Sequence, residues 1–118
     1  LLKEMVRNLI DNALNYTPST ETQPGVVTAR VCANADNGWR LEVEDSGPGI
    51  AVSERERVFE PFYRALGNEA DGSGLGLAIV REIANKHHAS VSISDTREGR
   101  TPPGTRFSVS FLSGNPSP

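Results

Sequence analysis

Residues 7–16 read RNLIDNALNY, and the rest of the chain can be interpreted outward from this stretch. At 3.6 residues per turn it belongs to a helix over residues 1–15, with one broad apolar stripe. The stripe consists of Leu2, Met5, Val6, Leu9, Ile10 and Ala13. Asn8, Asn12 and Asn15 recur at spacings of four and three on the opposite side. Surface helices favour Lys, Glu or Arg, whereas neutral amides suit a hydrated cation and phosphate oxygens. We therefore expect this face to form the floor of a ligand site.

The composition is that of one globular domain. The 118 residues are 36% hydrophobic and 23% charged, which suits a single modest core and excludes a disordered chain. The net charge is −3 and the basic residues are scattered, so no nucleic-acid partner is expected. No apolar run approaches the roughly 20 residues of a membrane span, and the single cysteine, Cys32, excludes an internal disulfide. We expect a soluble, cytoplasmic piece of a longer protein.

The hydrophobic pattern predicts three helices and four strands, with the strands largely in hairpins. Strands are expected at residues 26–33, 39–45, 90–95 and 105–112, and a second long helix at 76–88. Ser53 and Glu56 have the spacing of a capping box, which predicts a short helix carrying Val58 and Phe59. Together these elements indicate an α+β two-layer sandwich, with a mixed, mostly antiparallel sheet and three helices on one face. The domain would cover residues 1–112, followed by a flexible tail at 113–118.

Two predicted strands each carry an inward-facing polar residue at one of their ends. Asp45 continues the apolar row Trp39, Leu41 and Val43, and Thr105 begins the row Phe107, Val109 and Phe111. An inward carboxylate is costly unless it is paired, so Asp45 needs a hydrogen-bond donor. It could cap a turn onto Gly47, or it could be reserved for the amino group of a ligand. With Thr105 nearby through water, the pair suits an aminopurine edge.

Glycines are concentrated in two loops. Residues 45–50, DSGPGI, follow a strand, and residues 71–77, DGSGLGL, open into a helix at Gly76. The backbone amides at the start of that helix favour an anion. The second spacing matches neither a P-loop nor the dinucleotide fingerprint. A simple β-turn for the first loop and a flexible linker for the second remain alternatives.

Four further residues have two possible roles each. Arg64, in the segment FEPFYR, could reach a phosphate or a partner surface. Tyr16 could flank a base or complete the core. His87 and His88 fall in the last helical turn, where a structural role is favoured.

The ordered set NLIDNALNY, DSGPGI, VFEPFYR and DGSGLGLAIV resembles the catalytic ATP-binding domain of bacterial sensor histidine kinases. The resemblance extends from residue 1 to Phe111 and implies the Bergerat-type fold of the GHKL superfamily. In detail, the residues of these motifs are similar to those of sensor kinases that control tricarboxylate uptake. The family implies a protein-histidine kinase domain, which binds Mg-ATP and donates its γ-phosphoryl group to a histidine on a separate dimerisation domain.

The resemblance also implies residue roles. Asn12, assisted by Asn8, would coordinate Mg²⁺, and Asp45 would accept a hydrogen bond from the adenine amino group. Asn8, Asn12 and Arg64 would form the catalytic set. The remaining cofactor-binding residues would be Asn15, Tyr16, Gly47, Gly49, Ile50, Gly72, Ser73, Gly74, Leu75, Gly76, Leu77 and Thr105.

The chain departs from the family pattern at three places. Lys or Arg usually stands at the position of Asn15, Gly usually stands at that of His88, and strand material usually precedes the first helix. A fourth position, Asn8, holds Glu in related ATPases, where the carboxylate activates water. An amide cannot act as that base, so ATP would be held for transfer.

The family also implies partners. These are the histidine-bearing dimerisation domain, a downstream response regulator and, for the full-length protein, a membrane-anchored homodimer whose cytoplasmic portion includes this domain. An anti-sigma-type serine kinase and a degenerate nucleotide-binding module of the same fold remain alternatives. An ATP-driven conformational clamp is disfavoured by Asn8.

Overall fold

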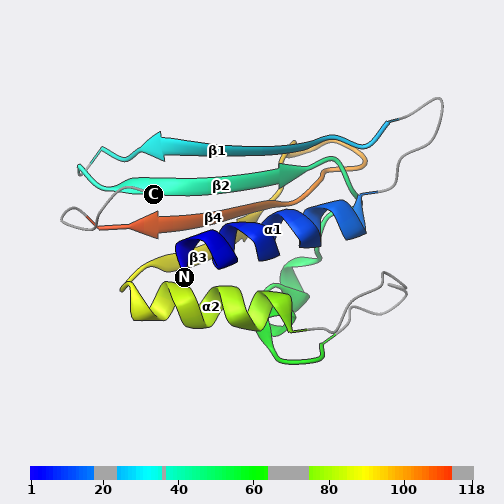
Figure 1. Ribbon diagram of the computed structural model, residues 1–118. Coiled ribbons are helices and arrows are strands. Elements are labelled where there is room, and N and C mark those ends of the chain that lie inside the picture. Colours follow the sequence, from blue (N-terminus) through cyan, green and yellow to red (C-terminus); the bar gives the residue numbers. More distant parts are fainter. Residues whose placement is uncertain (18–23, 36, 64–74, 113–118) are drawn as a thin grey trace.

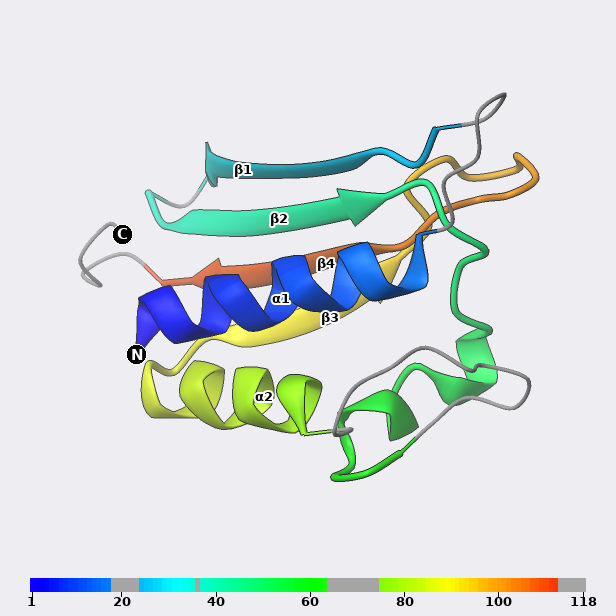
Figure 2. The same ribbon diagram turned by 45° about the vertical axis from the view of Figure 1, so that its right-hand side comes forward.

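A four-stranded antiparallel sheet carries two α-helices on one face (Figure 1). The structure, a computed structural model, describes residues 1–17, 24–35, 37–63 and 75–112, with the backbone alone at residue 16. Strands β1 (Val27–Ala33), β2 (Trp39–Asp45), β3 (Ser90–Ser94) and β4 (Arg106–Phe111) lie in the order β1-β2-β4-β3. Helices α1 (Leu2–Tyr16) and α2 (Gly76–Lys86) run side by side beneath the sheet in both views (Figure 2). The predicted two-layer α+β sandwich is confirmed, and every ladder among the described strands is antiparallel.

The core lies between the sheet and the helices, and strand parity explains it. Val43 pairs with Phe107, Leu41 with Val109 and Trp39 with Phe111, so the two apolar rows face the helices together. The rings of Trp39 and Phe111 stack with centroids 3.9 Å apart. The helices contribute the buried residues Met5, Leu9, Ala13, Val80, Ile83 and Ala84. The apolar stripe of the first helix therefore does what its spacing predicts.

The helix ends have local causes. α1 stops at Tyr16 because Thr17, which precedes a proline in the sequence, is extended (φ −110°, ψ 104°). α2 stops two residues earlier than expected, at Lys86. His88 then takes the left-handed φ of +55°, and the N–H of Ala89 donates to the carbonyl of Ala84 at 2.8 Å. This is the hydrogen bond of a Schellman cap, whose left-handed position is usually glycine.

The predicted middle helix is wrong in its details. Two short 3₁₀ turns, η1 (Val52–Glu54) and η2 (Arg57–Phe59), replace it. The N-cap of η1 is Ala51, without a side-chain capping bond, so Ser53 does not act as the cap. The N–H of Arg55 donates to Val52, three residues back, and Glu60 does the same to Arg57. Pro61 ends this segment, which is too short for helical hydrogen bonds to offset the free-energy cost of helix nucleation.

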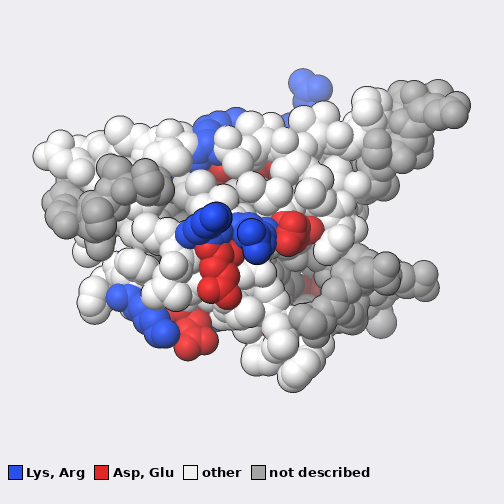
Figure 3. Space-filling model, in the orientation of Figure 1, with Lys and Arg blue, Asp and Glu red and all other residues white. Residues whose placement is uncertain are grey.

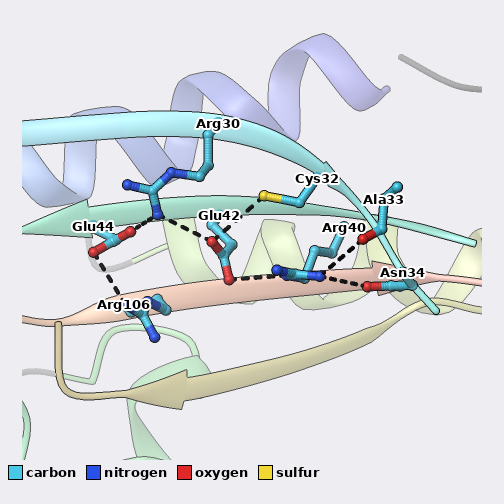
Figure 4. A network of polar contacts seen from close by, with 8 residues as sticks. All are labelled: Arg30, Cys32, Ala33, Asn34, Arg40, Glu42, Glu44 and Arg106. Carbon is cyan, nitrogen blue, oxygen red and sulfur yellow. Dashed lines mark hydrogen bonds and ion pairs between the residues drawn. The ribbon is translucent and has the colours of Figure 1, made fainter. Parts of the chain in front are cut away.

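The outer face of the sheet is a polar layer. Glu42 and Glu44 point away from the helices and yet are only 8% and 7% exposed, because arginine side chains cover them (Figure 4). Arg30 pairs with both carboxylates, Arg40 pairs with Glu42 at 3.1 Å, and Arg106 pairs with Glu44 at 3.4 Å. We call these five residues the outer-face network.

The solvent face of α1 carries charges of both signs, intermixed over the helix (Figure 3). Within the part of the chain that the structure describes, no helix is long and apolar enough to cross a membrane.

Candidate functional site

A pocket of about 90 Å³ opens where the carboxyl end of β2 meets the first residues of β4. It brings together residues far apart in the sequence, from both helices, two strands and the segment that contains the 3₁₀ turns. Its lining consists of Asn12, Asp45, Pro48, Gly49, Ile50, Glu54, Val58, Tyr63, Leu77, Thr105 and Phe107. Six of these, Asn12, Asp45, Gly49, Ile50, Leu77 and Thr105, are among the site residues predicted from the sequence. The pocket is largely apolar, and its polar lining includes the carboxylates of Asp45 and Glu54, the amide of Asn12 and the hydroxyls of Thr105 and Tyr63.

Asp45 is the buried polar anchor of the pocket. Its side chain points inward, as predicted, and the residue is 5% exposed. Its Oδ1 accepts two backbone hydrogen bonds, from the N–H of Gly47 at 2.8 Å and from the N–H of Thr105 at 3.1 Å. Burial raises the pKa of Asp45, and these two hydrogen bonds offset only part of that effect. The turn-capping interpretation is therefore confirmed, and it leaves Oδ2 for a ligand, since both bonds use Oδ1.

The loop after β2 is held against the loop before β4. The N–H of Gly104 donates to the carbonyl of Gly47 at 2.9 Å, and Gly49 has a φ of +84°. A Cβ on Gly49 would lie 2.8 Å from Cγ of Pro103, so this position requires glycine both for its backbone and for its packing. The close packing of the two loops fixes one wall of the pocket.

The asparagine face of α1 divides into three environments. Asn12 lines the pocket. Asn8 is half-buried against the start of α2: a Cβ on Gly76 would lie 3.4 Å from its Oδ1, while its Nδ2 donates to the carbonyl of Glu4 at 3.1 Å. Asn15 is exposed and does not line the pocket. Asn8 and Asn12 therefore lie on the side of α1 that meets α2 and the pocket, because α1 packs against both the sheet and α2, whereas Asn15 faces solvent.

The start of α2 lies next to Asn8, and its first backbone amides have no capping side chain. Leu75 occupies the N-cap position and has no polar side chain with which to cap the helix, and no side-chain capping bond is formed. An 11-residue helix whose first amides lack such a cap favours an anion at that end. Leu77, one residue into the helix, lines the pocket. The pocket and this helix end are therefore neighbours.

Five lining residues were not predicted: Pro48, Glu54, Val58, Tyr63 and Phe107. Tyr63 donates from its hydroxyl to the Glu54 carboxylate, and the guanidinium of Arg57 lies 5.2 Å from the centre of its ring. The hydrogen bond to Glu54 raises the pKa of the Tyr63 hydroxyl. The segment FEPFYR pointed to this region, but nothing in its spacing distinguishes the pocket-lining Tyr63 from the neighbouring Phe62, which is 70% exposed.

Four predicted site residues lie outside the described part of the chain. They are Arg64, Gly72, Ser73 and Gly74. For Tyr16 only the backbone is described. The two histidines lie elsewhere: His87 contacts the ring of Phe111 at a centroid distance of 6.2 Å, and His88 follows the C-terminal end of α2.

Comparisons with known proteins identify the family of this chain. The family model described as "Histidine kinase-, DNA gyrase B-, and HSP90-like ATPase" matches residues 1–115. A protein of Mycobacterium sp. (strain KMS) named signal transduction histidine-protein kinase/phosphatase MprB is 43% identical over 116 residues, which cover 98% of this chain and 22% of that protein.

Two solved structures extend the likeness to the fold. A mycobacterial sensor histidine kinase MprB matches with a TM-score of 0.85 and 35% identity, over 98% of this chain and 74% of that chain. Full-length ShkA in complex with AMPPNP matches with a TM-score of 0.72 and 29% identity, over 98% of this chain and 22% of that chain.

The chain belongs to the histidine kinase-, DNA gyrase B- and HSP90-like ATPase family, as the four ordered motifs predicted. Within this family, the chain is a catalytic domain of the sensor histidine kinase type. The names of these relatives give no support to the narrower resemblance to tricarboxylate-uptake sensors. The chain spans about a fifth of the length of the curated relatives it matches, at 22% for the MprB protein above.

Proposed function

We propose that this domain binds Mg-ATP and donates the γ-phosphoryl group to a histidine on a separate dimerisation domain. The observation that carries the proposal is Asp45, a buried carboxylate held by two backbone amides at one end of an apolar pocket that Asn12 also lines. An apolar slot with one inward acceptor suits a flat ring that bears an amino group. AMPPNP, an ATP analogue, is present in the ShkA structure that this fold matches.

At the base end, Asp45 Oδ2 would accept from the adenine amino group. Ile50 and Leu77 would contact the ring faces, and Thr105 would contribute its hydroxyl through water. Gly47 and Gly49 would let the backbone approach the base. Tyr16, whose side chain is not described, would complete this end.

At the phosphate end, Asn12 and Asn8 would hold Mg²⁺ and the phosphate oxygens, together with the first backbone amides of α2 from Gly76 onward. The close approach of Gly76 to Asn8 and the lack of a side-chain cap on α2 fit an anion here. When bound, Mg²⁺ neutralises charge on the phosphates during transfer. Gly72, Ser73, Gly74 and Arg64 are proposed for the same end on the motif alone, and Asn15, being exposed, would at most contact the ligand at its rim.

The chemistry that these residues support is transfer. The amide of Asn8 cannot take a proton from water at neutral pH, so the domain alone would turn over ATP slowly. In the transfer step the bond between the γ-phosphorus and the bridging oxygen breaks, and a P–N bond to the acceptor imidazole forms. ADP leaves, and the imidazole proton passes to solvent. His87 and His88 are not suitable acceptors, because α2 places them roughly 16 Å from Gly76.

The proposal includes the assembly around the domain. The acceptor histidine would lie on the dimerisation domain of the same full-length kinase, which would be a membrane-anchored homodimer with this domain on the cytoplasmic side. A response regulator would receive the phosphoryl group. A binding module without transfer is the second candidate, because Asn15 stands exposed where the family usually has Lys or Arg.

Transfer and binding can be separated by one experiment. The domain is mixed with its cognate histidine-bearing dimerisation domain and γ-labelled ATP, and acid-labile phosphohistidine is measured. Labelled phosphohistidine supports transfer, while ATP binding without any label would leave only the binding module.

The metal role of Asn12 has its own test. We expect Asn12→Ala to weaken ATP binding at least about tenfold in the presence of Mg²⁺ and by less than about twofold in its absence. Asn85→Ala, an exposed change near the far end of α2, is the matched control. Equal losses with and without Mg²⁺ would assign Asn12 to another role.

A further inference from the structure

Arg55 connects the pocket loop to the far edge of the sheet. It lies between η1 and η2, and its guanidinium donates to three acceptors. Nε donates to the carbonyl of Ile50 at 3.0 Å, Nη2 to Oδ1 of Asp95 at 3.0 Å, and Nη1 to the carbonyl of Ile93 at 3.4 Å. Its side chain is only 24% exposed, and its partners on the β3 side lie 38 and 40 residues away in sequence.

The residues that Arg55 joins belong to, or are paired with, two parts of the pocket wall. Ile50 lines the pocket on the loop side. On the sheet side Ile93 pairs with Phe107 in the β3–β4 ladder, and Phe107 also lines the pocket. One planar, charged group therefore fixes the position of one wall relative to the strand pair that carries the other.

The rest of the loop is held by different contacts. Gly47 is bonded to Gly104, and Gly49 packs against Pro103, so both are secured from the side of the β3–β4 connection. The carbonyl of Ile50 points the other way, to Arg55. Loss of the guanidinium would release the Ile50 end of the loop while leaving the Asp45 corner in place.

We propose that Arg55 is a positioning residue for nucleotide recognition, which sets the gap between Ile50 and Phe107 to the thickness of the base. The inference rests on the proposed ATP site and adds a determinant of base selectivity to it. Arg55 itself does not line the pocket, and it acts through Ile50. A guanidinium suits this role because its fork holds several acceptors at once, whereas an ammonium is a point charge on a flexible stem.

A positioning role and a merely structural role predict different binding data. If Arg55 only stabilised the fold, Arg55→Ala would lower the affinity for Mg-ATP and Mg-GTP by the same factor. If it sets the gap, the ATP affinity falls and the preference for ATP over GTP narrows, because the Ile50 wall no longer presses the base toward Asp45.

The experiment measures Kd for Mg-ATP and Mg-GTP with the folded domain, at a temperature where urea unfolding shows each variant to be native. We expect Arg55→Ala to weaken ATP binding about tenfold and GTP binding by less than about twofold. Arg55→Lys should recover part of the loss, and Asp95→Asn, which keeps an acceptor oxygen, should lose about twofold to threefold. Ile50→Ala should cost less in the Arg55→Ala background than in the wild type.

Arg81→Ala is the matched control. Arg81 also ties a side chain of the 3₁₀ segment, Glu56, at 3.1 Å, and its guanidinium lies 4.3 Å from the centre of the Phe59 ring, away from Ile50. An unchanged ATP/GTP preference in Arg55→Ala, or an equal narrowing in Arg81→Ala, overturns the inference. If Arg55→Ala does not fold, the ratio of ATP to GTP affinity in Arg55→Lys and Asp95→Asn tests the inference instead. Wild-type protein that binds neither nucleotide overturns the proposed function and this inference together, whereas wild-type binding with unaltered variants overturns the inference alone.

Discussion

At the scale of single residues, Asp45 has opposite effects on the free protein and on recognition. Burial raises its pKa, so the folded state holds its proton more tightly than the unfolded chain does. The contribution of Asp45 to stability therefore falls as the pH rises through the interval between the unfolded and folded pKa values. Ionisation of Asp45 in the folded protein therefore has a cost in free energy, which a ligand amino group would reduce.

Asp45→Asn separates these two effects. The amide oxygen can still accept from Gly47 and Thr105, so we expect the free energy of unfolding at pH 7 to fall by no more than about 0.5 kcal/mol, or to rise. The difference from wild type should move in favour of Asn as the pH increases from 4 to 7. ATP affinity should drop at least about tenfold, because Asn cannot reproduce a charged acceptor. Urea unfolding and nucleotide titration measure the two. Unchanged ATP affinity would leave Asp45 a turn cap and nothing more.

Gly104 lies against the backbone of Asp45, beside the turn that Asp45 caps. Its φ is +71°, and a Cβ would lie 2.1 Å from the carbonyl oxygen of Asp45. Gly99 is a natural control, because its φ is +78° but nothing lies within 4 Å of its Cβ position. We expect Gly99→Ala to cost about 1 kcal/mol from backbone strain, and Gly104→Ala to cost at least about 2 kcal/mol more from the clash. Equal losses of stability in urea would mean that the corner relaxes around the methyl group.

The inward direction of Asp45 and Thr105 could be predicted, and their mutual contact could not. Strand alternation places both side chains on the core face without knowledge of the rest of the fold. The hydrogen bond between them joins residues 60 positions apart, and its formation depends on the pairing of β2 with β4. Arg55 was missed for the same reason, since its acceptors belong to a loop and to a distant strand.

At the scale of elements, the C-terminal end of α2 holds a strained cap. His88 occupies the left-handed position of the Schellman motif with a φ of +55°. A side chain with a Cβ is disfavoured there by about 1–2 kcal/mol. The glycine that the family resemblance implies at this position would avoid this strain.

His88→Gly should therefore stabilise the domain by about 1 kcal/mol, because relief of strain exceeds the greater entropy of glycine in the unfolded chain. Asn37→Gly provides the control: Asn37 also has a positive φ, of 67°, but asparagine tolerates this region well, so the change should be close to zero. Thermal unfolding of both variants measures the difference. A destabilised His88→Gly would show that the imidazole makes contacts that outweigh the strain.

The segment between β2 and α2 was the least predictable element. The spacing of Ser53 and Glu56 favours a capped helix, but the structure has Ala51 at the start of a 3₁₀ turn instead. Propensity over so few residues is weak, and tertiary contacts determine the outcome: Phe59 is buried with its ring edge-on to Phe107 at 6.2 Å. A local pattern could not anticipate that constraint.

At the scale of the whole molecule, the two faces of the sheet are stabilised by different forces. One face is an apolar core, and the other is the outer-face network. Desolvation alone would raise the pKa of Glu42, but hydrogen bonds from Arg40 and Arg30 outweigh it, and the net pKa is lowered. The resulting stability is present above the unfolded pKa and is lost as the pH falls through the folded pKa.

Glu42→Gln should lower the free energy of unfolding by about 1–2 kcal/mol at pH 7, because Gln cannot pair with two arginines. The gap should narrow as the pH falls below about 4.5, where the unfolded chain begins to protonate Glu42, and should close as the pH passes the lowered pKa of the folded state. Glu56→Gln, which removes a largely exposed pair with Arg81, should cost no more than about 0.5 kcal/mol. Urea unfolding between pH 3 and 7 tests this, and a gap that stays constant over that range would assign the loss to packing.

The architecture could be predicted from the sequence because the hydrophobic patterns of helices and strands have different periods. The pocket, which forms where several elements meet, was harder to predict. Asn12, Asp45, Leu77 and Phe107 come from four elements, and only the packed sandwich shows that they share one cavity.

The bond from the Thr105 amide to the Asp45 carboxylate also bears on how the domain is made. Because it closes a span of 60 residues, a growing chain that has formed β1 and β2 still lacks an amide that completes the corner until β4 is added. A nucleotide would then recognise the finished sheet and no earlier stage. Ligand at 100 times its Kd would raise the free energy of unfolding by about 2.7 kcal/mol, because it binds the native state alone. ATP would then stabilise the domain only after β4 has joined the sheet.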